Sequence, residues 1–251
     1  MVVVEVAVDG DAARLGPGNR LLHLAAFEIA LLQLVEMLAE TICEPAPVAM
    51  AQVAVRVIPG STEDTLRWVL PDFATRLVPF AVAVALIAAV WHPAWLGLTL
   101  GDLGVQVAFG LIALPVMFAL AALLQLPLSR RRGALTVPDV PDALLQGGYY
   151  LLNGPLEEGF FRGVVQGGVG ALLGAPAGFL VGTASYVLYH RLGGWQWLDV
   201  AATALAGIPL GLAFWLLPGP HSLLGVSIAH VGATCGFLGP GPFLLRKLRL
   251  L

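Results

Sequence analysis

Two adjacent glutamates and an arginine, in the run Glu157-Glu158-Gly-Phe-Phe-Arg162, lie in an otherwise apolar part of this chain. A charged side chain at the centre of a bilayer costs at least about 3 kcal/mol on insertion scales. The chain is 58% hydrophobic and only 12% charged, whereas soluble domains carry about 25% charged residues. The sequence therefore predicts an all-α, polytopic membrane protein in which these three charges serve a purpose.

Composition also narrows the classes of partner and cofactor. The 13 basic residues include one lysine, Lys247, and form no basic arm with interleaved aromatic residues, so nucleic acid is not an expected partner. Cys43 and Cys235 have neither a disulfide framework nor the spacing of metal ligands. No glycine-rich nucleotide loop or zinc-binding helix motif occurs. We expect no cofactor and no bound metal, and we expect the lipid bilayer to surround the protein.

The placement of charges divides the chain into three parts. Residues 1–76 are predicted to form an N-terminal arm, a helix over 21–43 that is amphipathic or a first membrane span, and an extramembrane connection over 44–76, with or without a short interfacial helix. Residues 77–129 are predicted to form two transmembrane helices. Residues 130–251 are predicted to form a helical core that carries the site.

Several apolar segments approach the roughly 20 residues that a helix needs to cross a bilayer. They cover residues 77–96, 104–127, 175–191, 197–217 and 221–244. A shorter apolar segment covers 142–152, and a further helix is expected from about Pro155 to about Leu173. We predict about six to eight membrane helices, with the site between the C-terminal spans.

The helix start near Pro155 is predicted because proline is favoured at the first helical position and Asn153 is a suitable cap. Glu157 and Glu158 then fall in the first turns, where the helix dipole favours negative charge. Glu158 and Arg162 are four residues apart and can pair, and this pair could be purely structural. Glu157 has no local basic partner. It is available as a general base, unless it is protonated or hydrogen-bonded to a neighbouring helix.

Two histidines bring imidazole groups to the same part of the sequence. His190 ends one predicted span, where a simple interfacial role is the alternative, whereas His230 lies inside the predicted span 221–244 without another charge. A histidine at that depth needs a polar partner or water. Together with the glutamates, these residues predict a carboxylate–imidazole site in a membrane cavity. Such a site can activate water and stabilise the oxyanion that forms when water attacks a carbonyl, so we infer amide hydrolysis.

Two basic clusters indicate the orientation of the chain. They are Arg130-Arg131-Arg132 and Arg246-Lys247-Leu-Arg249. The predicted spans put both clusters on one side of the membrane. Basic residues favour the cytoplasmic side, so the C-terminus is predicted to be cytoplasmic.

Three motifs in this order resemble those of the CPBP family, the CAAX-protease and bacteriocin-processing membrane proteases, also called the ABI family. Its Glu-Glu-x-x-x-Arg motif corresponds to residues 157–162. Its aromatic-x-x-x-His motif corresponds to Tyr186-Val-Leu-Tyr-His190. Its third motif, histidine followed four positions later by asparagine or aspartate, reads His230-Val-Gly-Ala-Thr234 here. The resemblance covers residues 142–245 and extends to none of 1–130.

The resemblance implies a helical intramembrane endopeptidase that works without a bound metal, in a prokaryotic cell membrane. By motif match, Glu157 would activate water, His190 would help to hold that water, and His230 would face the oxyanion. Glu158 and Arg162 would shape the site. In this reading, residues 130–251 are the catalytic core, and the substrate is a lipidated protein, a leader peptide or another membrane-associated peptide.

Thr234 departs from the family pattern, because threonine offers one hydroxyl where the family has an amide or an acid. Losing one oxyanion donor costs about 10²–10³ in rate. Another donor, such as Asn153, could take its place. Two further functions therefore stay open: a non-proteolytic scaffold of the same fold, and a zinc-dependent membrane hydrolase in which Glu157, His190 and His230 bind the metal. The sequence does not specify an oligomeric state.

Overall fold

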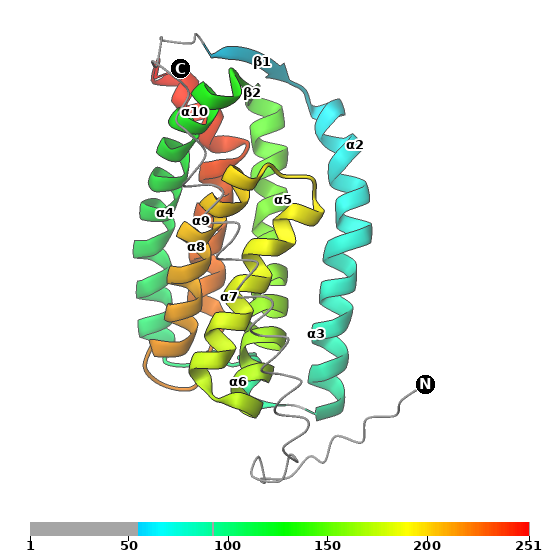
Figure 1. Cartoon of the computed structure of the whole chain (residues 1–251), viewed down its shortest axis with the longest axis vertical. Coiled ribbons are helices and arrows are strands. Elements are labelled where there is room, and N and C mark those ends of the chain that lie inside the picture. The colour runs from blue at the N-terminus through cyan, green and yellow to red at the C-terminus, as the bar shows by residue number, and fades with distance from the viewer. Residues whose placement is uncertain (1–54, 92, 251) are drawn as a thin grey trace.

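The computed structural model describes residues 55–91 and 93–250, so the predicted N-terminal arm and the predicted helix over 21–43 lie outside the described residues. Figure 1 shows long helices standing side by side, with a short two-stranded parallel sheet at one end. The elements in chain order are β1 (Arg56–Gly60), α2 (Thr62–Asp72), the π-helical η2 (Phe73–Leu77), α3 (Val78–Trp91), the 3₁₀ turn η3 (Ala94–Leu96), α4 (Leu103–Arg132), β2 (Ala134–Pro138), α5 (Val140–Glu158), the π-helical η4 (Gly159–Gly167), α6 (Gly168–Leu173), α7 (Ala175–Leu192), α8 (Trp197–Leu216), α9 (Leu224–Phe237) and α10 (Pro240–Lys247).

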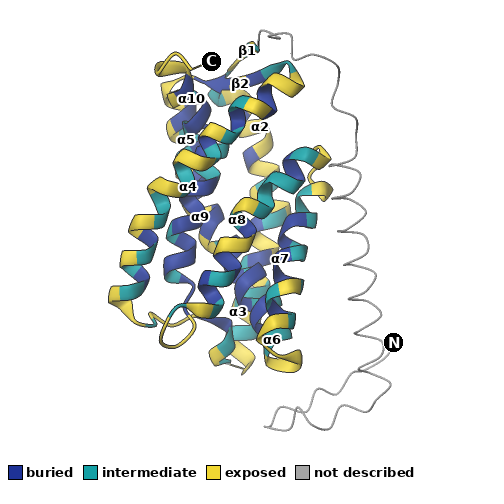
Figure 2. Cartoon of the chain, turned by 60° about the vertical axis from the view of Figure 1, so that its left-hand side comes forward, coloured by how far each residue is buried: buried dark blue, intermediate teal, exposed yellow. Residues whose placement is uncertain are grey.

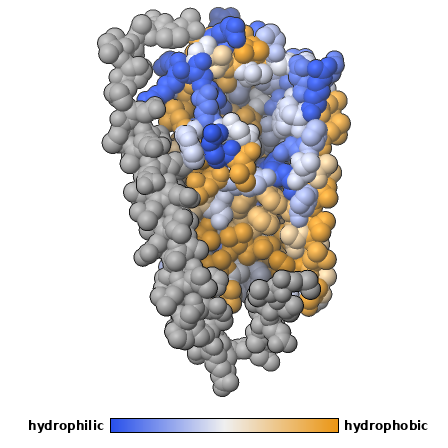
Figure 3. All heavy atoms as spheres, turned by 45° about the vertical axis from the view of Figure 1, so that its right-hand side comes forward, coloured by the Kyte–Doolittle hydropathy of each residue, from blue (hydrophilic) through white to orange (hydrophobic). Residues whose placement is uncertain are grey.

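The predicted all-α membrane fold is confirmed. Among the described residues, three helices are long and apolar enough to cross a membrane, namely Thr62–Trp91, Leu103–Arg132 and Trp197–Leu216. The pair α9 and α10, bent by 52° at its break, makes a fourth if it is one span. Large apolar side chains such as Leu86 and Ile112 are 60% and 68% exposed. Figure 3 shows hydrophobic residues over much of one face and hydrophilic residues gathered at one end, as expected of a surface covered by lipid.

Residues 62–76, which the sequence places in an extramembrane connection, are helical throughout. The chain continues from α2 through η2 into α3 without leaving the helix. The charges that suggested a loop pair one turn apart along this helix, as Glu63 with Arg67 and Asp72 with Arg76. Pro71 lies inside the helix, and the wider turns of η2 follow it directly. Proline removes one backbone hydrogen bond of the helix, and wider turns of this kind accommodate that loss.

Helix α5 corrects the predicted helix start near Pro155. It begins at Val140 and is capped by Asp139, whose carboxylate accepts the backbone N–H of Asp142 at 2.9 Å. Pro155 lies inside the helix, which continues past Glu158 as η4. The glutamates therefore lie inside a continuous helical stretch, where α5 passes into η4, rather than at a helix start. They gain no stabilisation from a helix N-terminus, and their charges need other partners.

Small residues on α9 allow this helix to approach α4 closely. A Cβ atom at Gly232 or Gly236 would overlap the backbone carbonyl group of Leu114 or Phe118. Close backbone approach of this kind is the usual way in which membrane helices pack. Figure 2 shows α9 as mostly buried, whereas α4 and α6 carry many exposed residues. His230 on α9 is consequently held in the interior, where it is 1% exposed.

The short sheet at the end of the bundle was not predicted. Strand β1 pairs in parallel with β2, with Arg56 opposite Ala134 and Gly60 opposite Pro138. Each strand leads within two residues into a helix that carries part of the site, β1 into α2 and β2 into α5. The sheet therefore ties the starts of these two helices together.

Candidate active site

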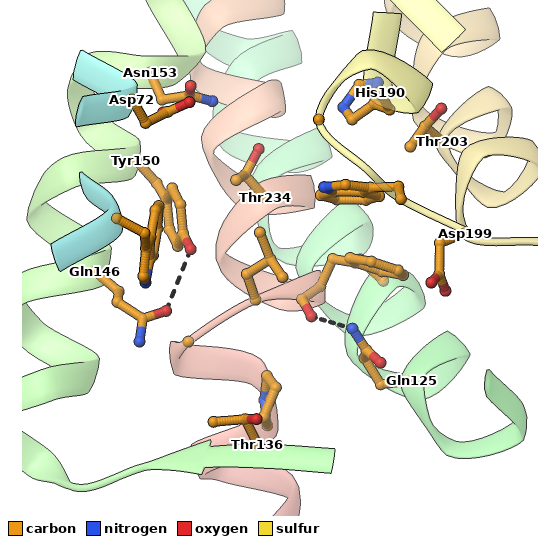
Figure 4. Close-up of a pocket in the computed structure, with 18 of the residues that line it drawn as sticks. Asp72, Gln125, Thr136, Gln146, Tyr150, Asn153, His190, Asp199, Thr203 and Thr234 are labelled. Atoms are coloured by element: carbon orange, nitrogen blue, oxygen red, sulfur yellow. Dashed lines mark hydrogen bonds between the residues drawn. The ribbon is translucent and has the colours of Figure 1, made fainter. Parts of the chain in front are cut away.

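A pocket of about 1680 Å³ lies among α2, α4, α5, α7, α8 and α9. Four of the six predicted site residues line it: Glu157, His190, His230 and Thr234. They come from α5, α7 and α9, so the fold brings together residues that are far apart in the sequence. Figure 4 shows His190, Thr234 and Asn153 around this pocket on three different helices. The other two predicted residues, Glu158 and Arg162, lie behind the pocket wall.

Glu158 and Arg162 form the expected ion pair. Nε of Arg162 lies 3.2 Å from Oε2 of Glu158, and both side chains are fully buried. The arginine also donates from Nη2 to the carbonyl oxygen of Gly207 at 3.0 Å, and its guanidinium lies 5.0 Å from the ring centroid of Tyr186. Because Arg162 lies in the π-helical η4, its side chain is presented differently from one in a regular turn, a feature common at functional sites.

His230 bridges the two glutamates. Its Nδ1 lies 2.7 Å from Oε1 of Glu158, and its Nε2 lies 3.4 Å from Oε2 of Glu157. An ionised carboxylate can only accept a hydrogen bond, so Nδ1 carries the proton in the contact with Glu158. The hydroxyl of Tyr186 also lies 3.4 Å from Nε2. The ring is thus oriented by one glutamate while its other nitrogen faces the second one.

Glu157 has a basic partner that the sequence did not predict. Its Oε1 pairs with Nη1 of Arg76, which lies in η2 at the junction of α2 and α3. The same guanidinium contacts Asp72 at 2.6 Å and Oδ1 of Asn153 at 2.7 Å. Glu157 therefore has no local basic partner, as predicted, but it pairs with an arginine from a distant part of the chain. One of its oxygens is fixed by Arg76, and the other faces His230.

His190 has a defined tautomer in this site. Its Nδ1 lies 2.8 Å from the backbone carbonyl oxygen of Tyr186, one turn earlier on α7. A carbonyl oxygen can only accept, so the proton of the neutral ring is on Nδ1. The ring packs edge-on against Tyr186 and Trp195, with centroids 4.9 Å apart in both cases. This leaves Nε2 as a hydrogen-bond acceptor at a residue that lines the pocket.

Thr234 lies one turn beyond His230 on α9 and lines the same pocket. Its hydroxyl makes no hydrogen bond to any part of the chain that the structure describes. Figure 4 shows it pointing into the pocket, on a helix between those of Asn153 and His190. Its position matches that of the family's amide or acid, but its side chain is shorter.

Residues 140–235 match the family model described as type II CAAX prenyl endopeptidase Rce1-like. Residues 140–235 are thus an Rce1-like core within the chain. The match contains all six predicted site residues, and it confirms the resemblance to the CAAX-protease family. At the level of the family, this match supports a CAAX-type membrane protease, which is a class of hydrolase. Neither the curated proteins nor the solved structures gave a match.

Sequence reasoning missed three residues that line the pocket, two of which lie outside the Rce1-like core. Arg76 and Asp72 precede the matched region, and Tyr149 donates its hydroxyl hydrogen to Asp72 from inside it. One signal could have identified Arg76. It forms an i,i+4 pair with Asp72 directly before an apolar helix, where unpaired charge is costly. Its contact with Glu157, however, joins residues 81 positions apart and has no local sequence pattern.

The arrangement of the histidine and acidic side chains can be compared with that of a zinc site. Within residues 55–91 and 93–250, no group of three or more histidine, cysteine, aspartate or glutamate side chains has the arrangement of a metal site. Glu157 and His230 are close to each other, but their nearest atoms are already directed at one another. Metal content therefore requires a direct measurement.

Proposed function

We propose that this protein is an intramembrane endopeptidase that hydrolyses peptide bonds with water activated by Glu157. Its substrates are lipidated proteins, leader peptides or other membrane-associated peptides. The observation that carries the proposal is the convergence of Glu157, His190 and His230 on one pocket inside an Rce1-like core. A carboxylate and two imidazoles around a cavity large enough for a peptide provide a base and two hydrogen-bonding groups.

Glu157 acts as the general base in this mechanism. Arg76 holds its Oε1, so Oε2 is the oxygen that takes a proton from water. His190 accepts the second water hydrogen at Nε2, since its Nδ1 is occupied by the carbonyl of Tyr186. The water oxygen is thereby oriented toward the substrate. Positioning and proton transfer of this kind contribute about 10²–10⁴ in rate.

The bond changes follow from these positions. The water oxygen bonds to the peptide carbonyl carbon, one water proton passes to Oε2 of Glu157, and the carbonyl oxygen becomes an oxyanion. The oxyanion then re-forms the carbonyl, the carbon–nitrogen bond breaks, and the proton held by Glu157 passes to the leaving amine. His230, with a proton on Nε2 as well as on Nδ1, donates a hydrogen bond to the oxyanion.

Glu158 and Arg162 support this arrangement from behind the pocket. Glu158 orients the ring of His230 at 2.7 Å, and Arg162 neutralises Glu158. Neither residue lines the pocket, so neither touches the substrate. A partner that orients a functional histidine in this way fixes both its tautomer and its direction.

We also propose that the chain lies in a prokaryotic cell membrane with its C-terminus in the cytoplasm. Both basic clusters support this orientation, since α4 ends at Arg132 and α10 at Lys247, next to the same short sheet (Figure 1). The pocket also reaches this sheet, because Ile58 and Thr136 line it. A substrate would then enter from the cytoplasmic side.

A substrate panel tests the activity. The purified chain, reconstituted in liposomes, is incubated with a peptide that ends in a prenylated cysteine followed by three residues, with its unprenylated form, and with a hydrophobic leader peptide. Mass spectrometry should detect two products of at least one peptide. Products from none of the three, in a folded protein, would contradict the proposal.

A second candidate, a non-proteolytic scaffold, is favoured by Thr234, which replaces the family's amide or acid. The variant Thr234→Asn separates the two functions in the same panel. Cleavage by the wild type supports the peptidase. Cleavage by Thr234→Asn alone supports the scaffold.

A further inference from the structure

The site lacks the amide or acid that the motif would provide at Thr234, yet another amide faces the same pocket. Asn153 is 3% exposed, lines the pocket and lies one helical turn before Glu157 on α5. Residues four apart on a helix share a face. The side chains of Asn153 and Glu157 therefore face the same part of the pocket.

The contact with Arg76 determines how the amide of Asn153 is oriented. Nη2 of Arg76 lies 2.7 Å from Oδ1 of Asn153. A guanidinium can only donate, so its partner must be the amide oxygen, and the amide nitrogen is turned away from it. Nδ2 donates no hydrogen bond to the described residues. Asn153 itself lines the pocket, on the wall formed by α5.

The segment of α5 that carries Asn153 packs against the segment of α9 that carries His230. A Cβ atom at Gly154, the residue after Asn153, would lie 2.9 Å from Val231 and 3.3 Å from the carbonyl oxygen of Ser227. The two helices are thus in close contact on either side of His230. Figure 4 shows Asn153 and Thr234 directed into the same pocket from these facing helices.

We propose that Asn153 is a catalytic residue whose Nδ2–H donates to the oxyanion, in place of the amide or acid absent at Thr234, and that Arg76 is the positioning residue that holds its amide in this orientation. The inference rests on the proposed peptidase function. It assigns Arg76 two tasks at once, since the same guanidinium fixes one oxygen of Glu157. The water-activating group and the oxyanion donor are therefore set by a single side chain from outside the Rce1-like core.

The decisive variant is Asn153→Asp, which keeps an oxygen for Arg76 and loses the N–H donors. With the best peptide of the substrate panel, kcat should fall by about 10²–10³, the effect of removing one oxyanion donor, while KM changes little. Asn153→Ala should lose a similar factor. If Asn153 only anchored Arg76, Asn153→Asp would retain wild-type kcat, and that result would overturn the inference.

Rescue separates a lost donor from damage to the fold. In the double variant Asn153→Asp/Thr234→Asn, the second substitution supplies an amide at the family's own position, so kcat should recover by at least about 10-fold over Asn153→Asp. The single variant Thr234→Asn should raise wild-type kcat by less than about 10-fold, because a donor is already present. A rise of about 10² or more in Thr234→Asn would overturn the inference even if the Asn153 variants failed to fold.

Gln166→Ala is the matched control. Gln166 is another buried carboxamide, which donates from Nε2 to the carbonyl oxygen of Gly211 at 2.8 Å, and it does not line the pocket. Its loss should lower the unfolding temperature but leave kcat within about 3-fold of wild type. Failure of the peptidase proposal is a separate outcome, because the wild type itself would then cleave nothing.

Discussion

Oε2 of Glu157 and Nε2 of His230 lie 3.4 Å apart at the contact between α5 and α9. The glutamate lies in the last turn of α5, which begins beside the short sheet, and the histidine is held in place by the packing of α9 against α4. The relationship depends on both helices, so the two halves of the proposed site form only when the bundle is assembled.

Glu158→Gln should lower the stability of the fold. The substitution leaves Arg162 fully buried without a carboxylate, and breaking a buried pair in this way costs about 3–5 kcal/mol. We expect a large fall in the unfolding temperature in detergent. Glu63→Gln is the matched control, since Glu63 pairs with Arg67 at the surface and should change little. Equal unfolding temperatures for the two variants would contradict the structural role of Glu158.

His190→Ala should lower kcat by about 10²–10⁴ without preventing folding, because its Nε2 is the proposed acceptor for the attacking water. The measurement is cleavage of the preferred peptide in liposomes. His221→Ala is the control: His221 bonds to the carbonyl oxygen of Phe214 and does not line the pocket. Retention of more than a tenth of wild-type kcat in His190→Ala would remove His190 from the mechanism.

Gly232→Ala should destabilise the fold, because the added methyl group would overlap the carbonyl of Leu114 and push α9 away from α4. Overpacking of this kind costs about 1–3 kcal/mol. At Gly148 of α5, a Cβ atom would meet nothing within 4 Å, so Gly148→Ala should be neutral or slightly stabilising. Thermal unfolding of both variants checks this. An unchanged unfolding temperature in Gly232→Ala would contradict the close packing of α9 against α4.

The membrane helices were the most predictable part of the fold. The predicted spans 104–127 and 197–217 correspond to α4 and α8, since hydropathy alone marks long apolar helices. Local signals failed where tertiary contacts override them. Pro155 suggested a helix start, yet it lies inside a helix that continues as a π-helical segment.

The site was predictable in its motif residues and unpredictable in its long-range contacts. The pair Glu158–Arg162 follows from i,i+4 spacing on one helix and is present. The pairing of Arg76 with Glu157 depends on how two distant helices pack, and no single-sequence pattern encodes that packing. The orientation of the Asn153 amide depends on the same arginine, so it could not be predicted from the sequence either.

Metal dependence separates the proposed mechanism from a zinc hydrolase. If Glu157 activates water directly, overnight treatment with a chelator followed by its removal should leave kcat unchanged, and elemental analysis should find far less than one zinc per chain. Stoichiometric zinc, with activity lost on chelation and restored by added zinc, would overturn the metal-independent mechanism. It would then assign Glu157, His190 and His230 as candidate ligands.

The most direct test of the central claim is the rate of peptide cleavage by Glu157→Gln. Glutamine keeps the size of the side chain but cannot accept a proton from water. Because Glu157 is the proposed base, we predict that kcat falls by at least about 10³ while the protein remains folded and still binds the peptide. A folded Glu157→Gln variant that cleaves within 10-fold of the wild-type rate would contradict the mechanism.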